Sequence, residues 1–115
     1  MTKGQQGYCF VYVTAPNAAE AEAMARKLVE ERLAACTNVF PPITSYYWWE
    51  GELQRDQEVS FIAKTRRDLA QAVIQRVRQL HSYQVPAVLV LDVVDGNPDY
   101  LAWVDAQCSP GQNQA

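Results

Sequence analysis

Residues 43–50 read ITSYYWWE, and the four positions from 46 to 49 all carry large rings. Successive side chains of a β-strand point to opposite faces, so Tyr46 and Trp48 should share one face and Tyr47 and Trp49 the other. A small domain covers only one face of such a strand with its own helices. Because each ring buries roughly 150–250 Å² when it is covered, the second face predicts a protein–protein interface or a ligand groove.

The residues around this aromatic segment predict a long hairpin. Residues 36–40 are typical of an extended segment, and two prolines interrupt it before the aromatic strand begins. Prolines are tolerated at a bulge or a sheet edge, where no ladder donor is required. The polar residues 51–57 predict the hairpin tip, and residues 58–65 predict the returning strand. The acidic residues here are expected on a solvated edge rather than in a metal cluster; they are Glu50, Glu52, Asp56 and Glu58.

Three helix starts can be predicted from capping residues. Asn17 followed by Glu20 is a capping box, and apolar residues recur behind it at helical spacing. Asp68 is expected to cap a second amphipathic helix of the same kind. Asn97 and Pro98 predict a short C-terminal helix, because asparagine is a preferred cap and proline fits the first turn.

The order of the elements predicts the fold class. Residues 8–14 are β-branched and aromatic, which favours a strand covered on both faces, and residues 87–94 are apolar enough to predict a central strand. The resulting βαββαβ order is that of a ferredoxin-like α+β fold, an antiparallel sheet with two helices on one face, here with a short C-terminal helix added. We expect a single domain over residues 8–108, with flexible polar tails at 1–7 and 109–115.

Composition excludes several classes of protein. The chain has 115 residues, a formal net charge of -3 and a pI near 5.0, so charge alone would not hold it to nucleic acid or to an anionic membrane. No apolar run approaches the roughly 20 residues of a membrane span, and the start has no signal-type segment, so a cytoplasmic protein is expected. The three cysteines lack any Cys-x-x-Cys pair, which favours reduced thiols.

Four motifs occur in one order along the chain. They are ERLAACxN at residues 31–38, TSxYWWEG at 44–51, HxYxVP at 81–86 and GNxxYLxW at 96–103. Together they resemble the CutA family of divalent-cation tolerance proteins, over about Phe10 to Trp103.

The resemblance implies an assembly and a role. CutA proteins have the βαββαβ core and form tight trimers similar to those of PII signalling proteins, with long strands paired between subunits. They are associated with tolerance to divalent metals, and some members bind copper. The sequence departs from the usual pattern at Ser82, Gln84 and Ala87, and it has Val13 where some members have cysteine.

Cys36 and His81 are the metal-ligand candidates. A thiolate and an imidazole suit copper or zinc, and both residues are predicted at helix ends that can fall on one edge of the fold or on neighbouring subunits. Burial of Cys36 as a small apolar side chain, and a capping or contact role for His81, are the alternatives. No cofactor is expected to be obligatory, and copper or another divalent cation is the expected optional ligand.

The aromatic segment is assigned to the assembly. Tyr46, Tyr47, Trp48 and Trp49 are expected in the trimer interface, with ligand stacking as the alternative. Tyr83, Lys64 and Trp49 are expected to line a cleft between subunits. Lys64, Arg66 and Arg67 could hold an anion at the start of the second helix, with a solvated basic surface as the alternative.

The function predicted from these features is that of a non-enzymatic homotrimer that binds or responds to metal ions. The chain has no Gly-rich phosphate loop, nucleophile elbow or His-rich triad, which argues against an enzyme. The alternative is a PII-like module that binds a small anionic metabolite in its cleft. Aromatic rings on a ferredoxin-like sheet can stack RNA bases, but the acidic balance and the lack of a basic strip argue against a nucleic-acid partner.

Overall fold

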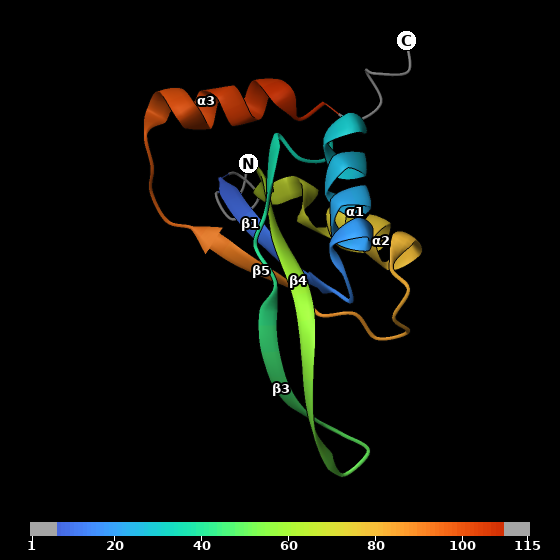
Figure 1. The fold of residues 1–115 in the computed structure, drawn as a ribbon. Coiled ribbons are helices and arrows are strands. Elements are labelled where there is room, and N and C mark those ends of the chain that lie inside the picture. Colours follow the sequence, from blue (N-terminus) through green and yellow to red (C-terminus); the bar gives the residue numbers. More distant parts are fainter. Residues whose placement is uncertain (1–6, 110–115) are drawn as a thin grey trace.

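A computed structural model describes residues 7–109 of the chain (Figure 1). The predicted tails lie almost wholly outside these residues. The elements in chain order are β1 (Tyr8–Ala15), α1 (Ala18–Glu30), β2 (Cys36–Val39), β3 (Ile43–Trp49), β4 (Glu52–Arg66), a short 3-10 helix (Arg67–Leu69), α2 (Ala70–Leu80), β5 (Val88–Val93) and α3 (Pro98–Gln107). No helix in the described part is long and apolar enough to cross a membrane.

The strands form one antiparallel sheet with a long arm. The order across the sheet is β2-β4-β1-β5, and β3 pairs with the outer part of β4. Strand β4 belongs to both the sheet and the arm, because its last residues pair with β1 and β2 while its first residues pair with β3. The β3–β4 hairpin therefore extends beyond the body (Figure 1), and the molecule with its arm has extents of 46 × 31 × 24 Å. The antiparallel α+β architecture predicted from the sequence is confirmed.

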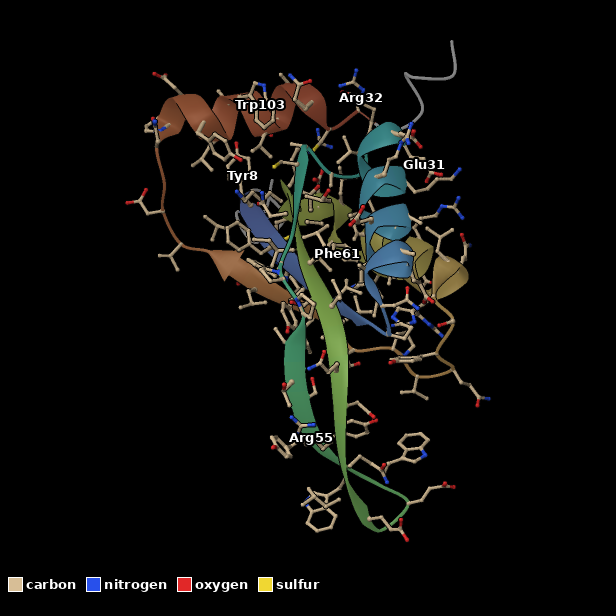
Figure 2. All side chains as sticks on the ribbon, in the orientation of Figure 1. Tyr8, Glu31, Arg32, Arg55, Phe61 and Trp103 are labelled. Carbon is tan, nitrogen blue, oxygen red and sulfur yellow. The ribbon has the colours of Figure 1, made fainter. Side chains whose placement is uncertain are left out.

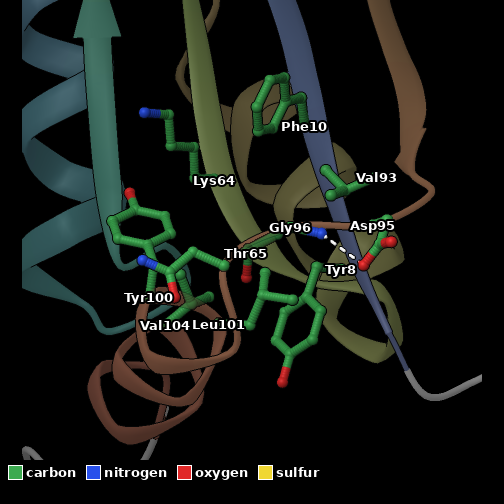
Figure 3. Close-up of a pocket in the computed structure, with 11 residues that line it drawn as sticks. Tyr8, Phe10, Lys64, Thr65, Val93, Asp95, Gly96, Tyr100, Leu101 and Val104 are labelled. Atoms are coloured by element: carbon green, nitrogen blue, oxygen red, sulfur yellow. Dashed lines mark hydrogen bonds between the residues drawn. The ribbon is translucent and has the colours of Figure 1, made fainter.

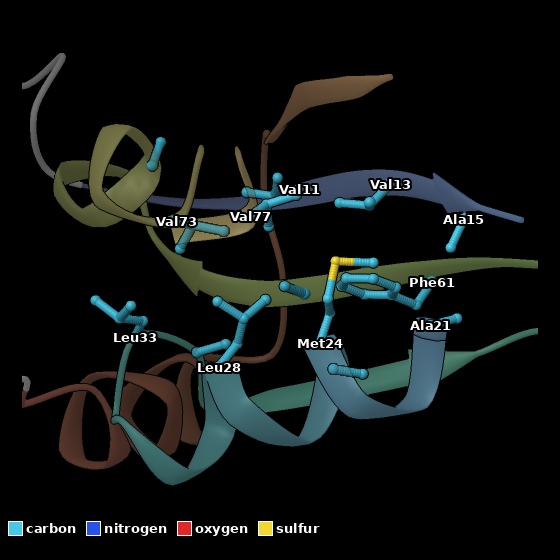
Figure 4. Close-up of a cluster of buried hydrophobic side chains, with 14 of the residues drawn as sticks. Val11, Val13, Ala15, Ala21, Met24, Leu28, Leu33, Phe61, Val73 and Val77 are labelled. Carbon is cyan, nitrogen blue, oxygen red and sulfur yellow. The ribbon is translucent and has the colours of Figure 1, made fainter. Parts of the chain in front are cut away.

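Helices α1 and α2 cover one face of the sheet. Phe61 of β4 is fully buried beside Met24 of α1, in a core cluster that also contains Leu28 of α1 and Val73 of α2 (Figure 4). Alternate residues of each strand supply this core, as the two-residue period of a strand requires. Burial of apolar side chains on this scale is the main force that holds the fold together.

Capping explains where α1 begins and ends. The side chain of Asn17 accepts a hydrogen bond from the Glu20 N–H at 2.9 Å, as the capping box predicts. After the helix, Arg32 adopts a positive φ of 63°. Its N–H donates to the Val29 oxygen, and the Leu33 N–H donates to the Leu28 oxygen. These bonds form a Schellman motif, which satisfies the last carbonyls of the helix and turns the chain into β2.

Helix α3 lies across the end of the sheet opposite the arm (Figure 1). It has Asn97 as its cap and Pro98 in its first turn, as predicted. Val104 packs with Cys108 and Ala35 in a small second cluster, so Cys108 is buried. The sequence around Cys108 is polar, and only the fold brings apolar neighbours to it.

Two strand predictions were wrong. Strand β5 lies at the edge of the sheet, although its apolar sequence predicted a central position. Strand β1 buries only one face, that of Val11 and Val13, while Phe10 and Tyr12 on the other face are half-buried. In both strands the apolar side chains fill two faces of the sheet, but the helices cover only one.

The predicted cap of α2 was also wrong. The helix follows a 3-10 turn, and no side chain caps its start. The Asp68 carboxylate instead pairs with Arg66, with 3.0 Å between the Arg66 Nε and the Asp68 Oδ1.

The sheet face opposite α1 and α2 is apolar and largely uncovered. We call it the open face; Phe10, Tyr12, Ile62, Leu89 and Leu91 share it by strand alternation and register. Leu89 is 61% exposed and Leu91 is 51% exposed. Helix α3 covers only the end of this face nearest Tyr8.

Candidate functional site

The arm places its four rings on two faces. Tyr46 pairs with Arg55 and Trp48 pairs with Leu53, so these side chains share one face of the hairpin. The Arg55 guanidinium lies 5.9 Å from the centre of the Tyr46 ring, a cation–π distance, while Trp48 is 73% exposed. Figure 2 shows Arg55 far out along the arm, where the side chains stand clear of the body.

The other face of the arm lines a groove. Tyr47, Trp49 and Glu58 of the arm face the loop that precedes β5, across a cavity of about 490 Å³. We call this cavity the aromatic groove; its lining is completed by Thr14, Ser45, Tyr83, Gln84, Val85 and Ala87. Trp49 and Tyr83, which were expected in a cleft between subunits, therefore lie in one groove of a single chain.

Carboxylates fix the two tyrosines of the aromatic groove. The Tyr83 hydroxyl donates to Glu58 at 3.2 Å, and the Tyr47 hydroxyl donates to Asp56. Burial of Tyr83, together with the charge of Glu58, raises the pKa of its phenol to about 12. The hydrogen bond to Asp56 likewise raises the pKa of Tyr47. Both phenols therefore stay protonated and act as donors over the whole physiological pH range.

Glu58 has a different role from the one predicted. It is half-buried in the aromatic groove, whereas the sequence placed it with the other acidic residues on a solvated edge. Its position follows from the long β4 strand, in which residue 58 lies where the arm joins the sheet. Charge pattern alone carried no signal that separates Glu58 from its acidic neighbours.

His81 uses both of its ring nitrogens. Its Nε2 lies 2.7 Å from the main-chain oxygen of Thr14, and its Nδ1 accepts from the Tyr83 N–H at 3.0 Å. A ring that accepts at Nδ1 and faces a carbonyl at Nε2 is the neutral Nε2–H tautomer. The side chain is fully buried, and the Glu20 carboxylate lies 3.6 Å from Nδ1. The only lone pair that could bind a metal is therefore already occupied by a hydrogen bond.

Cys36 is a half-buried thiol with weak contacts. It belongs to β2, and its sulfur lies 3.9 Å from the Thr37 main-chain oxygen and 4.0 Å from Asn38 Oδ1. These are long contacts for a thiol donor. Of the two metal candidates, Cys36 is the one whose ligand atom a metal could reach without displacing a strong hydrogen bond.

The two metal candidates do not meet within one chain. Cys36 pairs with Lys64 on one side of β4, while Thr14, the partner of His81, pairs with Ser60 on the other side. From Lys64 to Ser60 is four residues, or about 13 Å along the strand. Within residues 7–109 no group of three or more His, Cys, Asp or Glu side chains could hold a metal ion.

Lys64 lies in a second, smaller pocket. This pocket of about 200 Å³ lies between α3 and the open face (Figure 3). The Lys64 ammonium is 5.7 Å from the centre of the Tyr100 ring and 5.9 Å from that of Phe10. Cation–π contacts hold it there, at the opposite end of the sheet from the aromatic groove. In a single chain, then, Lys64 does not share a cleft with Tyr83 and Trp49.

The chain matches one protein family over most of its length. The model of the family described as "CutA1 divalent ion tolerance protein" matches residues 9–107. A relative from Xenopus laevis named "Protein CutA homolog" is 50% identical over 93 residues, which are 81% of this chain and 62% of that protein. The "Divalent-cation tolerance protein CutA" of Archaeoglobus fulgidus is 41% identical over 96 residues, or 84% of this chain and 93% of that protein.

Solved structures agree with the sequence match. The crystal structure of CutA1 from Oryza sativa superimposes with a TM-score of 0.88 at 40% identity, covering 92% of this chain and 97% of that one. The CutA structure from Archaeoglobus fulgidus has a TM-score of 0.86 at 38% identity and covers 89% and 99%. The chain spans only 62% and 52% of the frog and mouse relatives it matches. On the match over residues 9–107 and these identities, the protein belongs to the CutA1 family of divalent ion tolerance proteins.

Proposed function

We propose that this protein acts in divalent-cation tolerance as a non-catalytic homotrimer that binds metal ions such as copper. The proposal rests on the uncovered apolar surface of the single chain. Both the open face and the Tyr46–Trp48 face of the arm carry large exposed side chains, among them Trp48 and Leu89. Large exposed apolar patches of this kind mark protein–protein interfaces.

The position of the two surfaces favours an assembly in which the arm of one subunit packs on the open face of another. The open face lies on the body and the exposed rings lie on the arm, so each surface needs a partner of the other kind. Two subunits could exchange arms as a two-fold pair, or each subunit could pass its arm to the next and close a ring. We propose the trimeric ring because it is the assembly that the CutA resemblance implies. In it, the arm of one subunit covers the open face of the next.

The metal site in this proposal uses donors from more than one subunit. Cys36 contributes a thiolate from the open-face side of β2, where register places it beside Lys64. His81 contributes its Nδ1 only if the Tyr83 N–H moves away from it. Thiolate and imidazole both suit copper and zinc. A site shared between subunits would also explain why one described chain brings no three ligands together.

Two measurements test the proposal. Light scattering of the native protein at micromolar concentration should give three times the chain mass. Calorimetric titration with Cu(II) and Zn(II) should show binding that Cys36→Ala weakens strongly and His81→Ala weakens less. A folded single subunit would overturn the assembly, and equal metal binding by the wild type and both variants would remove these residues as ligands.

The aromatic groove favours a second candidate function, a PII-like module that binds a small effector. Its volume lies within the range of ligand pockets, roughly 300–1,000 Å³. The charged side chain that lines it is Glu58, which would repel the small anionic metabolite that the sequence suggested. A thermal-shift screen with nucleotides and carboxylic acids tests that class directly, and no shift with either would remove it.

A further inference from the structure

The aromatic groove combines three aromatic rings with a carboxylate that forms no ion pair within residues 7–109. Tyr47, Trp49 and Tyr83 supply the rings and Glu58 supplies the charge. We propose that this groove is a binding site for a small organic cation, an ammonium group attached to an apolar body. The ammonium lies against the rings and Glu58, and the apolar body extends along Val85 and Ala87.

The charge of the site favours a cation. Glu58 accepts a hydrogen bond from the neutral Tyr83 hydroxyl, and Asp56 accepts one from Tyr47. Among the described residues, no Lys, Arg or His forms an ion pair with either carboxylate. Arg55, the nearest cation along the arm, lies over Tyr46 on the opposite face. A half-buried carboxylate without a counter-charge attracts a cation more strongly than an exposed one, because water screens it less.

The rings suit an organic cation in particular. The face of an aromatic ring carries negative quadrupole charge, and several rings around one ammonium add their attractions. The hydroxyls of Tyr47 and Tyr83 are held by carboxylates, so two of the three rings are oriented before any ligand arrives. Preorganisation of this kind reduces the entropy lost on binding.

Other ligand classes fit the groove less well. Calcium takes 6–8 oxygen ligands, and copper and zinc prefer thiolate or imidazole, whereas the groove offers one carboxylate and no Cys or His. An anion in the groove would be repelled by the Glu58 carboxylate at close range. A neutral apolar molecule would gain nothing from that charge. An organic cation alone uses both the rings and the carboxylate.

The test compares three probes that share one benzene ring and differ in charge. Native protein in its natural assembly is titrated by calorimetry with benzyltrimethylammonium, benzyl alcohol and benzoate. We expect the cation to bind, the alcohol to bind at least about tenfold more weakly, and benzoate not to bind. The contacts of the ammonium group with the carboxylate and the rings are together worth more than a factor of about ten in affinity, and the alcohol lacks them. Added salt should weaken the binding of the cation.

Variants locate the site. Glu58→Gln keeps the shape and removes the charge, and Trp49→Ala removes a ring; each should weaken benzyltrimethylammonium binding by about threefold to thirtyfold. Matched controls are Glu22→Gln on the exposed face of α1 and Trp103→Ala on α3, which should bind as the wild type does. Circular dichroism and light scattering check that each variant keeps its fold and assembly. If Trp49→Ala disturbs the assembly, the affinity of Glu58→Gln alone decides whether the cation binds in the groove.

Three results would overturn the proposal. They are the absence of cation binding at millimolar concentration, equal affinity for the cation and benzyl alcohol, and undiminished cation binding by Glu58→Gln. None of them bears on metal binding by Cys36 and His81, which do not line the groove.

Discussion

The Nε2 atom of His81 lies 2.7 Å from the main-chain oxygen of Thr14, next to the end of β1. The other ring nitrogen accepts the Tyr83 N–H, so one buried imidazole joins the last turn of α2, the first strand and the loop that lines the aromatic groove. Both ring nitrogens of His81 thus have a hydrogen-bond partner, and buried polar networks that are fully satisfied in this way favour a unique local structure. His81 therefore positions Tyr83 in the groove.

Replacing His81 should destabilise the fold. His81→Ala leaves the Thr14 oxygen and the Tyr83 N–H without their partner, and an unsatisfied buried polar group costs about 1–3 kcal/mol. Urea unfolding followed by circular dichroism measures the loss. Arg78→Ala, at an exposed position of the same helix, is the control and should change the free energy of unfolding little. Equal stability of both variants would show that the His81 hydrogen bonds are not needed.

The core elements could be predicted from sequence because their signals are local. The Asn17 cap, the helical spacing after it and the alternation of β4 each depend on residues close together in the chain. The position of β5 could not be predicted in this way. Its apolar run indicates burial on two faces, and a sequence does not say whether the second face is covered by the same chain or by another.

The candidate site was predictable only in part. Trp49 and Tyr83 lie in one groove of a single chain, because the hairpin and the loop before β5 converge at the base of the arm. The cleft between subunits expected for them stays a prediction. Lys64 lies at the other end of β4, and Cys36 and His81 lie on different sides of that strand. Strand lengths and register decide these distances, and the motifs of the sequence do not contain them. Glu58 was missed for the same reason.

Thiol reactivity should separate the three cysteines. Cys9 and Cys108 are buried, and burial raises the pKa of the Cys9 thiol to about 11, so little thiolate forms near neutral pH. Cys36 is half-buried with only long contacts. Titration of the native protein with Ellman's reagent should give one fast thiol per chain, and Cys36→Ser should abolish it. Fast reaction of a second thiol before unfolding would contradict this assignment.

Acid should weaken the link between α1 and α2. The Arg76 guanidinium donates to both carboxylate oxygens of Glu31, at 2.9 and 2.8 Å, and this hydrogen bonding lowers the pKa of Glu31 below its ordinary value of 4.5. Because the folded-state pKa is depressed, the pair stabilises the protein above the ordinary pKa. Its contribution is lost as the pH falls through the folded-state value.

Unfolding curves recorded between about pH 6 and about pH 3 test this link. Glu31→Gln should be less stable than the wild type near neutrality, and the difference should shrink as the pH falls. Glu22→Gln, an exposed change of the same charge, should show no such trend. A difference that stays constant with pH would assign the effect of Glu31→Gln to something other than ionisation.

The hydroxyl of Thr65 joins β4 to the turn after α1. It donates to the Leu33 main-chain oxygen at 2.6 Å, and the side chain is 1% exposed. Thr65→Val keeps the volume but leaves that oxygen unsatisfied, so we expect a loss of about 1–3 kcal/mol. Thr65→Ser, which retains the hydroxyl, should lose less. If the valine variant proves the more stable of the two in urea, packing outweighs the hydrogen bond at this position.

The last prediction concerns the open face. Leu89 is 61% exposed there and pairs with Tyr12 of β1, so its side chain lies where a neighbouring arm would pack. Leu89→Glu places a carboxylate in the proposed interface, and burying it without a partner costs several kcal/mol in each subunit. The variant should therefore dissociate to folded single subunits, measured by light scattering and circular dichroism.

Gln75→Glu, the same change of charge on the exposed side of α2, is the control and should stay assembled. Leu89→Glu places its carboxylate on the open face, whereas Gln75→Glu places it on the outer side of α2, the helix that covers the opposite face of the sheet. Dissociation of Leu89→Glu alone would place the subunit contact on the open face. An unchanged mass for Leu89→Glu would mean that this face stays in water, and then the apolar run of β5 would have no partner to explain it.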